Sequence, residues 1–326
     1  MLKKLTIAFA ASAALLAATT SGMAQTKLKW AHVYETSEPF HTASVWAAGE
    51  INKRTNGRYQ IDVYPASQLG KETDINQGLS LGSVDMIISG SSFAAKSFPP
   101  IGVTYYPYTF RDADHLLAYT KSDVFKELAK GYEDKTKHKV IALTYYGERM
   151  VTANKEIKKP EDMKGMKLRV PPAPLYLMLA KSVGANATPI AFAEVYLALQ
   201  QGTVDGQENP LPTIMAKKFY EVQSHVMLTG HITESLLTIV GAHVWAKLND
   251  DEKKIFQDTL IQAAAKASDE IRASEQKIAH ELRKLNKTVV QVDREAFRKA
   301  AVPLHNDASA GAGWTQAQYD EFQALK

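Results

Sequence analysis

One short segment occurs twice in this 326-residue chain. Residues 79–85 and 199–205 both read Leu-x-x-Gly-[Ser/Thr]-Val-Asp, and the copies lie 120 residues apart. In each copy an amphipathic run ends at a glycine, which can take the left-handed conformation that stops a helix, and a strand follows. The repeat predicts two similarly wound α/β lobes, although a helix–glycine–strand pattern can also recur by chance. Ligands of open α/β sheets sit beyond the carboxyl ends of strands, so two facing lobes would form a cleft.

The first 24 residues have the features of an export signal. Lys3 and Lys4 give a positive start, and residues 5–18 are almost wholly apolar. Gly-Met-Ala at residues 22–24 then supplies the small residues that a signal peptidase needs. The alternative is an uncleaved membrane anchor, but the apolar run is short and rich in small residues. We therefore expect a cleaved signal peptide at 1–24 and export of a chain that begins at Gln25.

Charge and cysteine content narrow the class of protein further. Removal of Lys3 and Lys4 takes the formal net charge from +4 to +2, which gives no reason to expect nucleic acid as a partner. The chain has no cysteine, so disulfides, thiolate metal sites and a cysteine nucleophile are excluded. No stretch after the signal is apolar enough to span a bilayer. An exported protein without disulfides is typical of a bacterial periplasm.

Strand and helix patterns alternate along the chain. Ser37 is a candidate helix cap with Pro39 in the first turn, and Gly57 is the expected stop of that helix. Strands separated by helical stretches indicate βαβ units and a largely parallel sheet. The expected strands are residues 28–33, 59–64, 84–89, 140–145, 149–153, 167–170 and 203–207.

A long helix breaks this alternation. Asn249 and Glu252 have the spacing of a capping box, and no proline or glycine follows until Asn286. Residues 250–285 would form about 54 Å of helix at 1.5 Å per residue, more than the roughly 30 Å that one small lobe spans. The helix should therefore lie across both lobes as a spine. Two shorter helices with an unmarked break are the alternative.

The sequence lacks the motifs of common enzymes. It has no His-Glu-x-x-His, Gly-x-Ser-x-Gly or Gly-x-Gly-x-x-Gly string, and Gly70-Lys71 is followed by glutamate rather than serine or threonine. The nine histidines are scattered without the spacing of a metal site. We expect no metal, no cofactor and no catalysis.

Several motifs occur in a fixed order along the chain. The most specific is Met-Lys-Leu-Arg-Val-Pro at 166–171, followed by Pro-Ile-Ala-Phe-Ala-Glu-Val-Tyr-Leu-Ala-Leu-Gln at 189–200. Val-Asp-Gly-Gln-Glu-Asn-Pro at 204–210 completes that core. Three shorter motifs lie at 64–70, 162–165 and 218–222. Together and in this order, the motifs resemble the periplasmic solute-binding proteins of TRAP transporters of the DctP type, and the resemblance covers essentially the whole mature chain.

The resemblance implies an α/β fold of two lobes, with a ligand cleft between them and a long helix that spans both. It implies an N-terminal lobe of residues 25–147 plus about 235–275, and a C-terminal lobe of 148–234 plus about 276–326. A carboxylate ligand would be enclosed by the lobes and delivered to the TRAP membrane permease subunits. Membrane contact would come only through the permease, and we expect a periplasmic monomer.

Three C-terminal-lobe residues match the family's ligand clamp. Arg169 matches the arginine that holds the ligand carboxylate, and a guanidinium offers a planar fork that meets both carboxylate oxygens. Arg149 matches a second family arginine, and its alternative role is a salt bridge between the lobes. Asn209 would hold the carboxylate from the other side through its amide nitrogen. Glu208, its neighbour, is left as a structural residue.

The remaining candidate ligand-binding residues come from loops and strand ends. Phe192 would lie against the ligand, or else in the core. Glu72 would accept ligand hydroxyls, or else be an exposed acid at a helix start. The polar groups at strand ends are expected either to contact the ligand or to be satisfied in packing; they are His32, His231, Ser89, Ser91 and Ser92.

The pattern near the first and third strands favours a particular ligand. Sialate-binding members carry an acidic residue after the third strand, where this chain has Ser-Gly-Ser-Ser at 89–92. They also carry an asparagine near the end of the first strand, at a position that falls at about Val33 in this chain. The chain resembles members that take hexuronates, so glucuronate or galacturonate is the expected ligand. The alternatives are sialate, an aldonate or a C4-dicarboxylate, and a periplasmic sugar-acid enzyme is a further one.

Overall fold

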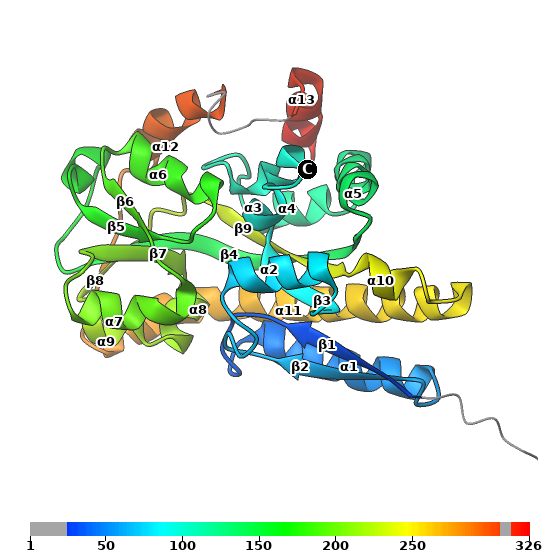
Figure 1. Cartoon of the computed structure of the whole chain (residues 1–326). Coiled ribbons are helices and arrows are strands. Elements are labelled where there is room, and N and C mark those ends of the chain that lie inside the picture. Colours follow the sequence, from blue (N-terminus) through cyan, green and yellow to red (C-terminus); the bar gives the residue numbers. More distant parts are fainter. Residues whose placement is uncertain (1–24, 307–313) are drawn as a thin grey trace, which may run out of the picture.

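The computed structural model describes residues 25–306 and 314–326, so the expected signal peptide lies outside the described residues. Two lobes share one mixed β-sheet flanked by helices (Figure 1). The strands follow the order β2-β1-β3-β9-β4-β7-β5-β6, and β8 pairs with both β4 and β10. The predicted two-lobed α/β fold is confirmed.

Each lobe has its own set of helices and strands. The N-terminal lobe contains β1 (Thr26–Ala31), α1 (Pro39–Arg54), β2 (Tyr59–Tyr64), α2 (Glu72–Leu81), β3 (Met86–Gly90), α3 (Ser91–Ala94), the 3-10 helix η1 (Pro99–Tyr105), α4 (Ala113–Tyr119), α5 (Asp123–Thr136), β9 (Thr233–Val240) and α10 (Ala242–Trp245). The C-terminal lobe contains η2 (Pro160–Met163), β5 (Lys167–Val170), η3 (Pro174–Tyr176), α6 (Leu177–Ser182), β6 (Asn186–Pro189), η4 (Phe192–Glu194), α7 (Val195–Gln200), β7 (Gly206–Pro210), α8 (Leu211–Ala216), α9 (Phe219–Val222), β8 (His225–Met227), β10 (Thr288–Val290), α12 (Arg294–Ala301) and η5 (Val302–Asn306).

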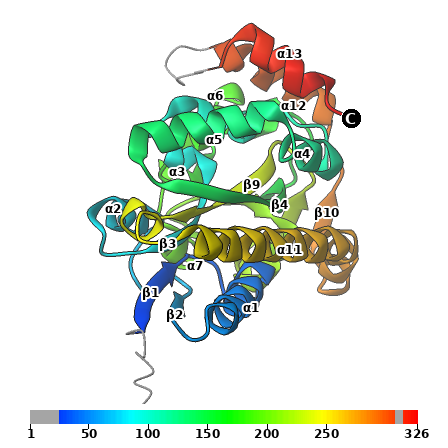
Figure 2. The ribbon, with the colours of Figure 1, turned by 90° about the vertical axis from the view of Figure 1, so that its right-hand side faces the viewer.

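Two elements belong to both lobes. β4 (Lys139–Ala153) pairs with β9 along its first part and with β7 and β8 along its last five residues. α11 (Asp250–Lys284) packs on α1 and β4 and reaches α8 and β10, so it runs the width of the molecule (Figures 1 and 2). At 35 residues it spans about 52 Å as one helix. The predicted capping box is present, because Glu252 N donates to Asn249 Oδ1 and Asn249 N to Glu252 Oε2, each at 2.9 Å.

The repeated segment ends a helix in the same way in both lobes. Gly82 (φ 76°) follows α2 and Gly202 (φ 67°) closely follows α7, and both have left-handed backbone. The conformation expected of these two glycines is confirmed.

The aspartate of each copy then ties the turn to a neighbouring strand. Asp85 N donates to Lys29 O (3.1 Å), and Lys29 N donates back to Asp85 Oδ2 (2.7 Å). Asp205 and Lys167 make the same pair of bonds at 2.9 and 2.8 Å. The repeat therefore specifies one joint used twice, and chance recurrence does not account for two identical bond patterns.

The centre of the sheet differs from the sequence-based prediction. β1 is parallel to β2 and β3, and β5 is parallel to β6 and β7, but β9 is antiparallel to β3 and β4. The strands predicted at 140–145 and 149–153 are one strand, β4. Gly147 (φ 120°), between the two predicted segments, lies at a register shift within that strand. A largely parallel sheet is therefore wrong for the strands that connect the lobes.

Smaller differences occur at element ends. The cap of α1 is Glu38 rather than Ser37, although Pro39 does open the helix. α1 ends at Arg54, and Gly57 lies three residues beyond it with φ 80°. β7 begins at Gly206, so the strand expected from 203 starts three residues later.

The C-terminal helix lies against the N-terminal lobe. The sequence-based boundary puts residues 276–326 in the C-terminal lobe, whereas α13 (Gln316–Ala324) packs on α5 (Figure 1). Its buried Phe322 contacts the rings of Phe110 and Tyr119 at centroid distances of 5.9 and 6.4 Å. Within residues 25–306 and 314–326, every helix is too short or too polar to cross a membrane.

Candidate functional site

A cavity lies between the lobes, at the carboxyl ends of β1 and β5. Its free volume is about 20 Å³, far less than the roughly 300–1,000 Å³ typical of small-molecule sites. Residues of both lobes and of β4 line it: Val33, Tyr34, Glu72, Tyr146, Arg149, Arg169, Pro171, Pro172, Tyr176, Ala191, Phe192 and Asn209. Five of the ten residues predicted for the ligand site are among them.

Arg169, at the end of β5, has an unsatisfied guanidinium. Its side chain is 1% exposed, and Nε and Nη2 both donate to Ile190 O, at 2.9 and 2.7 Å. Its Nη1 is buried without a hydrogen-bond partner, and among the described residues no carboxylate forms an ion pair with it. Burial disfavours the charged form and lowers the pKa of Arg169 to about 10. A buried cationic nitrogen without a partner is costly, so it favours an anion in the cavity.

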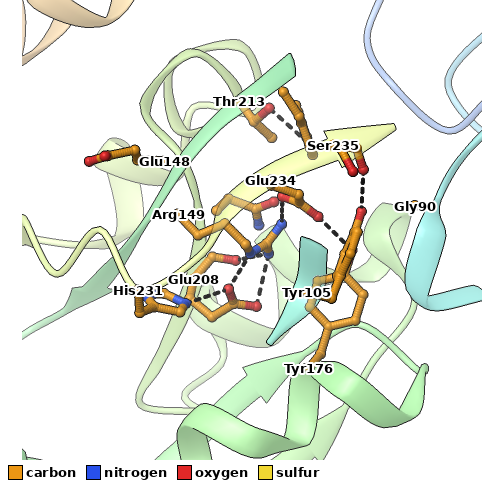
Figure 3. A network of polar contacts seen from close by, with 12 residues as sticks. Gly90, Tyr105, Glu148, Arg149, Tyr176, Glu208, Thr213, His231, Glu234 and Ser235 are labelled. Carbon is orange, nitrogen blue, oxygen red and sulfur yellow. Dashed lines mark hydrogen bonds and ion pairs between the residues drawn. The ribbon is translucent and has the colours of Figure 1, made fainter. Parts of the chain in front are cut away.

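Arg149, in β4, is held by carboxylates from both sides (Figure 3). Its Nε and Nη2 bond to Glu208 of β7, the Nη2–Oε1 distance being 2.8 Å, and Nη1 bonds to Glu234 of β9. Its guanidinium also lies 4.9 Å from the ring centroid of Tyr176. All four groups are buried. The predicted alternative, a salt bridge between lobes, is therefore present, and one N–H of Nη1 is left for the cavity.

Asn209 and Phe192 lie on the C-terminal-lobe side of the cavity. Asn209 Nδ2 donates one N–H to Gln207 Oε1 (2.6 Å), which leaves its second N–H without a protein partner. Phe192 is half-buried, its ring centroid 6.3 Å from that of Tyr34 and 5.2 Å from Lys217 Nζ. Both side chains line the same cavity as Arg169.

Glu72, the first residue of α2, lies on the N-terminal-lobe side. Its Oε1 accepts from Ser89 Oγ and from Gly90 N, both at 2.8 Å. Asn76 Nδ2 donates to Ser89 Oγ (2.8 Å), so a chain of donors orients the carboxyl group. Burial raises the pKa of Glu72 to about 7, because the charged form loses its hydration. Ser89 itself does not line the cavity and acts on Glu72 instead.

Four further predicted residues lie outside the cavity lining. Ser91 Oγ bonds to Thr104 Oγ1 (2.9 Å), and Ser92 Oγ accepts from Leu175 N (3.3 Å), which joins the two lobes. Both serines are fully buried.

The two histidines are likewise buried in the core, and His32 Nδ1 has no hydrogen-bond partner there. His32 Nε2 lies 3.3 Å from His41 Nδ1, and its ring stacks behind Tyr34. His231 bonds to Glu208 Oε2 (3.1 Å) and to Thr229 Oγ1 (2.9 Å), so it supports the partner of Arg149 (Figure 3). The placement of His231 matches the packing alternative, because both of its ring nitrogens have partners, whereas His32 is packed with one nitrogen unsatisfied.

Sequence reasoning missed several cavity residues. Tyr34, Tyr146 and Tyr176 supply aromatic walls, and Glu234 holds both Tyr176 OH (2.7 Å) and Arg149. Glu208, interpreted from the sequence as a structural residue, bonds to Arg149 beside the cavity. Its place beside Asn209 was the one available signal, whereas nothing in the sequence around Glu234 indicates a site.

The pKa of Glu72 predicts a pH-dependent stability. Between pH about 4.5 and about 7 the folded protein holds a proton on Glu72 that the unfolded chain has released. The free energy of unfolding should therefore fall as pH rises through that window. Above pH about 7 the contribution of Glu72 to that free energy should no longer change with pH. Glu72→Gln removes the effect, so the melting temperature of the variant minus that of the parent should increase from pH 4.5 to 8. A difference that does not vary with pH would contradict a raised pKa.

Most of the chain is similar to proteins of one known family. Residues 30–311 match the family model of bacterial extracellular solute-binding proteins, family 7 (DctP). A solute-binding protein of Roseobacter denitrificans is 34% identical over 88% of this chain and 88% of its own length. The sialic acid-binding periplasmic protein SiaP of Vibrio cholerae is 33% identical over 91% of this chain and 93% of its own.

Solved structures of TRAP periplasmic solute-binding proteins match the fold. One from Polaromonas, bound to D-erythronate, has a TM-score of 0.87 and 30% identity, and covers 93% of this chain and 99% of its own. One from Citrobacter koseri with bound D-glucuronate has a TM-score of 0.87 at 26% identity, over 93% and 100%. One from Roseobacter denitrificans with bound L-galactonate has a TM-score of 0.83 at 30% identity, over 92% and 98%.

Proposed function

The chain belongs to family 7 of the bacterial extracellular solute-binding proteins, the DctP type that serves TRAP transporters, and from that premise we propose that it captures a sugar acid in the periplasm and delivers it to a TRAP permease. The signal peptide at 1–24 is part of this proposal, because export places the protein beside its permease. The family consists of binding proteins, so the ligand would be released unchanged.

One observation carries the proposal: the unpaired Nη1 of the buried Arg169 at a cavity between the lobes. A ligand carboxylate there would give this nitrogen the charge-assisted hydrogen bond that the protein does not supply. The free N–H groups of Arg149 and Asn209 would complete the clamp. Phe192 would pack against the ligand.

Glu72 favours a ligand that has hydroxyl groups on the side away from its carboxylate. Both of its hydrogen bonds from the protein go to Oε1, so Oε2 remains for ligand hydroxyls. A sugar acid has a carboxylate for Arg169 and hydroxyls for Glu72, whereas succinate has no hydroxyl. Among sugar acids we propose a hexuronate, glucuronate or galacturonate. The relative from Citrobacter koseri with bound D-glucuronate supports this choice.

A second candidate ligand is an aldonate. The Roseobacter denitrificans protein, 34% identical to this chain, was solved with bound L-galactonate. An aldonate has the same single carboxylate and row of hydroxyls in an open chain. The two ligand types differ in the ring, not in the groups that Arg169 and Glu72 would meet.

A thermal-shift panel tests the proposed function. D-glucuronate, D-galacturonate and L-galactonate are compared with glucose, succinate and sialate. Ligand at 100 times its Kd stabilises the folded state by about 2.7 kcal/mol, which raises the melting temperature by about 4 °C for a chain of this size. A rise with a hexuronate and none with glucose is expected. A rise with L-galactonate alone would favour the aldonate, and no rise with any acid would refute the proposal.

A further inference from the structure

The buried arginines around the cavity are already matched in number by buried glutamates before a ligand enters. Two cations, Arg149 and Arg169, stand against two anions, Glu208 and Glu234, and all four side chains are at most 1% exposed. Arg149 bonds to both glutamates, so its charge is fully matched. Each ligand carboxylate therefore adds a negative charge that no further buried cation of this group compensates.

Unsatisfied groups nevertheless leave room for one carboxylate. Among the described residues, Arg169 Nη1 is the one buried cationic nitrogen that has no hydrogen-bond partner. On the N-terminal-lobe side the cavity is lined by Glu72, whose Oε1 is occupied by Ser89 and Gly90. A second ligand carboxylate would lie against the other oxygen of Glu72, whose carboxyl group already feels the negative charge of the buried Glu234.

We infer that the cavity selects sugar acids with a single carboxylate and rejects the matching dicarboxylates, the aldarates, and that Glu72 is the residue that enforces this choice. The inference rests on the proposed function, since it assumes that a sugar acid binds at Arg169. It adds a substrate class: a monoanion with a hydroxyl or hydroxymethyl group where an aldarate has its second carboxylate.

The size of the effect follows from Coulomb's law. Two like charges about 6 Å apart at an effective dielectric constant of about 20 repel strongly enough to weaken binding by up to ~100-fold. Solvent at the cavity mouth reduces this, so we expect a weakening of at least ~30-fold. A hydroxymethyl group in the same place has no such penalty and can donate a hydrogen bond to the carboxyl group.

D-gluconate and D-glucarate provide the test, because they are open-chain acids that differ in one end group. Each is titrated at pH 8 as a competitor of D-glucuronate in calorimetry with the purified protein. D-gluconate should compete at least ~30-fold better than D-glucarate.

Glu72→Gln should shrink that ratio by at least ~tenfold, because an amide removes the charge and offers a donor to the second carboxylate. The amide oxygen can still accept from Ser89 and Gly90, so the variant should fold, which its melting curve verifies. Asp74→Asn is the matched control. It removes a charge from the exposed side of the same helix turn and should leave the ratio unchanged.

The outcomes separate the two proposals. Glucuronate binding with no better competition by gluconate than by glucarate overturns the inference and leaves the proposed function intact. A ratio as large in Glu72→Gln as in the parent overturns the role of Glu72. No binding of any sugar acid refutes both.

Discussion

Replacing Arg169 with alanine should weaken hexuronate binding by about 30- to 4,000-fold, because loss of one partner of a buried charged pair costs about 2–5 kcal/mol. The protein should still fold. The variant loses the bonds to Ile190 O, but it also no longer buries a cationic nitrogen that lacks a partner. These two effects oppose each other, so the melting temperature without ligand should change little.

Calorimetric titration with D-glucuronate measures the loss. Arg169→Lys should be nearly as poor as alanine, since a lysine keeps the charge but cannot present two parallel donors. Arg298→Ala is the control, because Arg298 lies exposed on α12 and pairs with Glu295 of the same helix. Affinity of the alanine variant equal to that of the parent would show that Arg169 is not the carboxylate clamp.

Replacing Arg149 with methionine should destabilise the fold itself. Glu208 and Glu234 would be left buried without their cation, and breaking a buried ion pair costs about 3–5 kcal/mol. The loss should be larger at pH 8 than at pH 5, since protonation can relieve the two carboxylates only at low pH. Urea unfolding followed by circular dichroism measures the change in the free energy of unfolding.

A charge-matched rescue distinguishes this cause from a packing defect. Arg149→Met combined with Glu208→Gln and Glu234→Gln removes the stranded charges and should recover part of the lost stability. If the triple variant is no more stable than Arg149→Met alone, the loss comes from packing around Tyr176 and not from the unpaired carboxylates. Weak ligand binding by any Arg149 variant must be interpreted together with this stability, because the residue joins the two lobes.

The parts of the fold that could be predicted are those that depend on local sequence signals. The stop at Gly82 and Gly202 and the cap at Asn249 each depend on a few neighbouring residues, so the sequence contains them in full. β4 was harder to predict, because residues 146–148, between the two predicted strands, continue the strand through a register shift at Gly147. The antiparallel centre of the sheet depends on pairing between β4 and β9, which are far apart in the sequence.

The site likewise divides into residues that local motifs predict and residues that only the folded chain brings together. Family motifs pointed to Arg169, Arg149, Asn209, Glu72 and Phe192, and all of them line one cavity. The partners of Arg149 lie 59 and 85 residues further along the chain, and no spacing rule connects them. Ser91, Ser92 and His231 have the right residue types at strand ends, but their hydrogen bonds are taken by neighbours in the core.

The path of the chain between the lobes sets the order in which the protein can be completed. The N-terminal lobe needs β9 and the first part of α11, which come after the whole β5–β8 region, and its α5 is covered by α13 at the very end of the chain. During synthesis, the lobe that emerges first must wait for the residues of α13. Its apolar surfaces around Phe110 and Tyr119 stay uncovered until Phe322 arrives. A truncation of the final dozen residues should therefore harm the first lobe, and a chaperone that holds the unfinished chain would protect it at that stage.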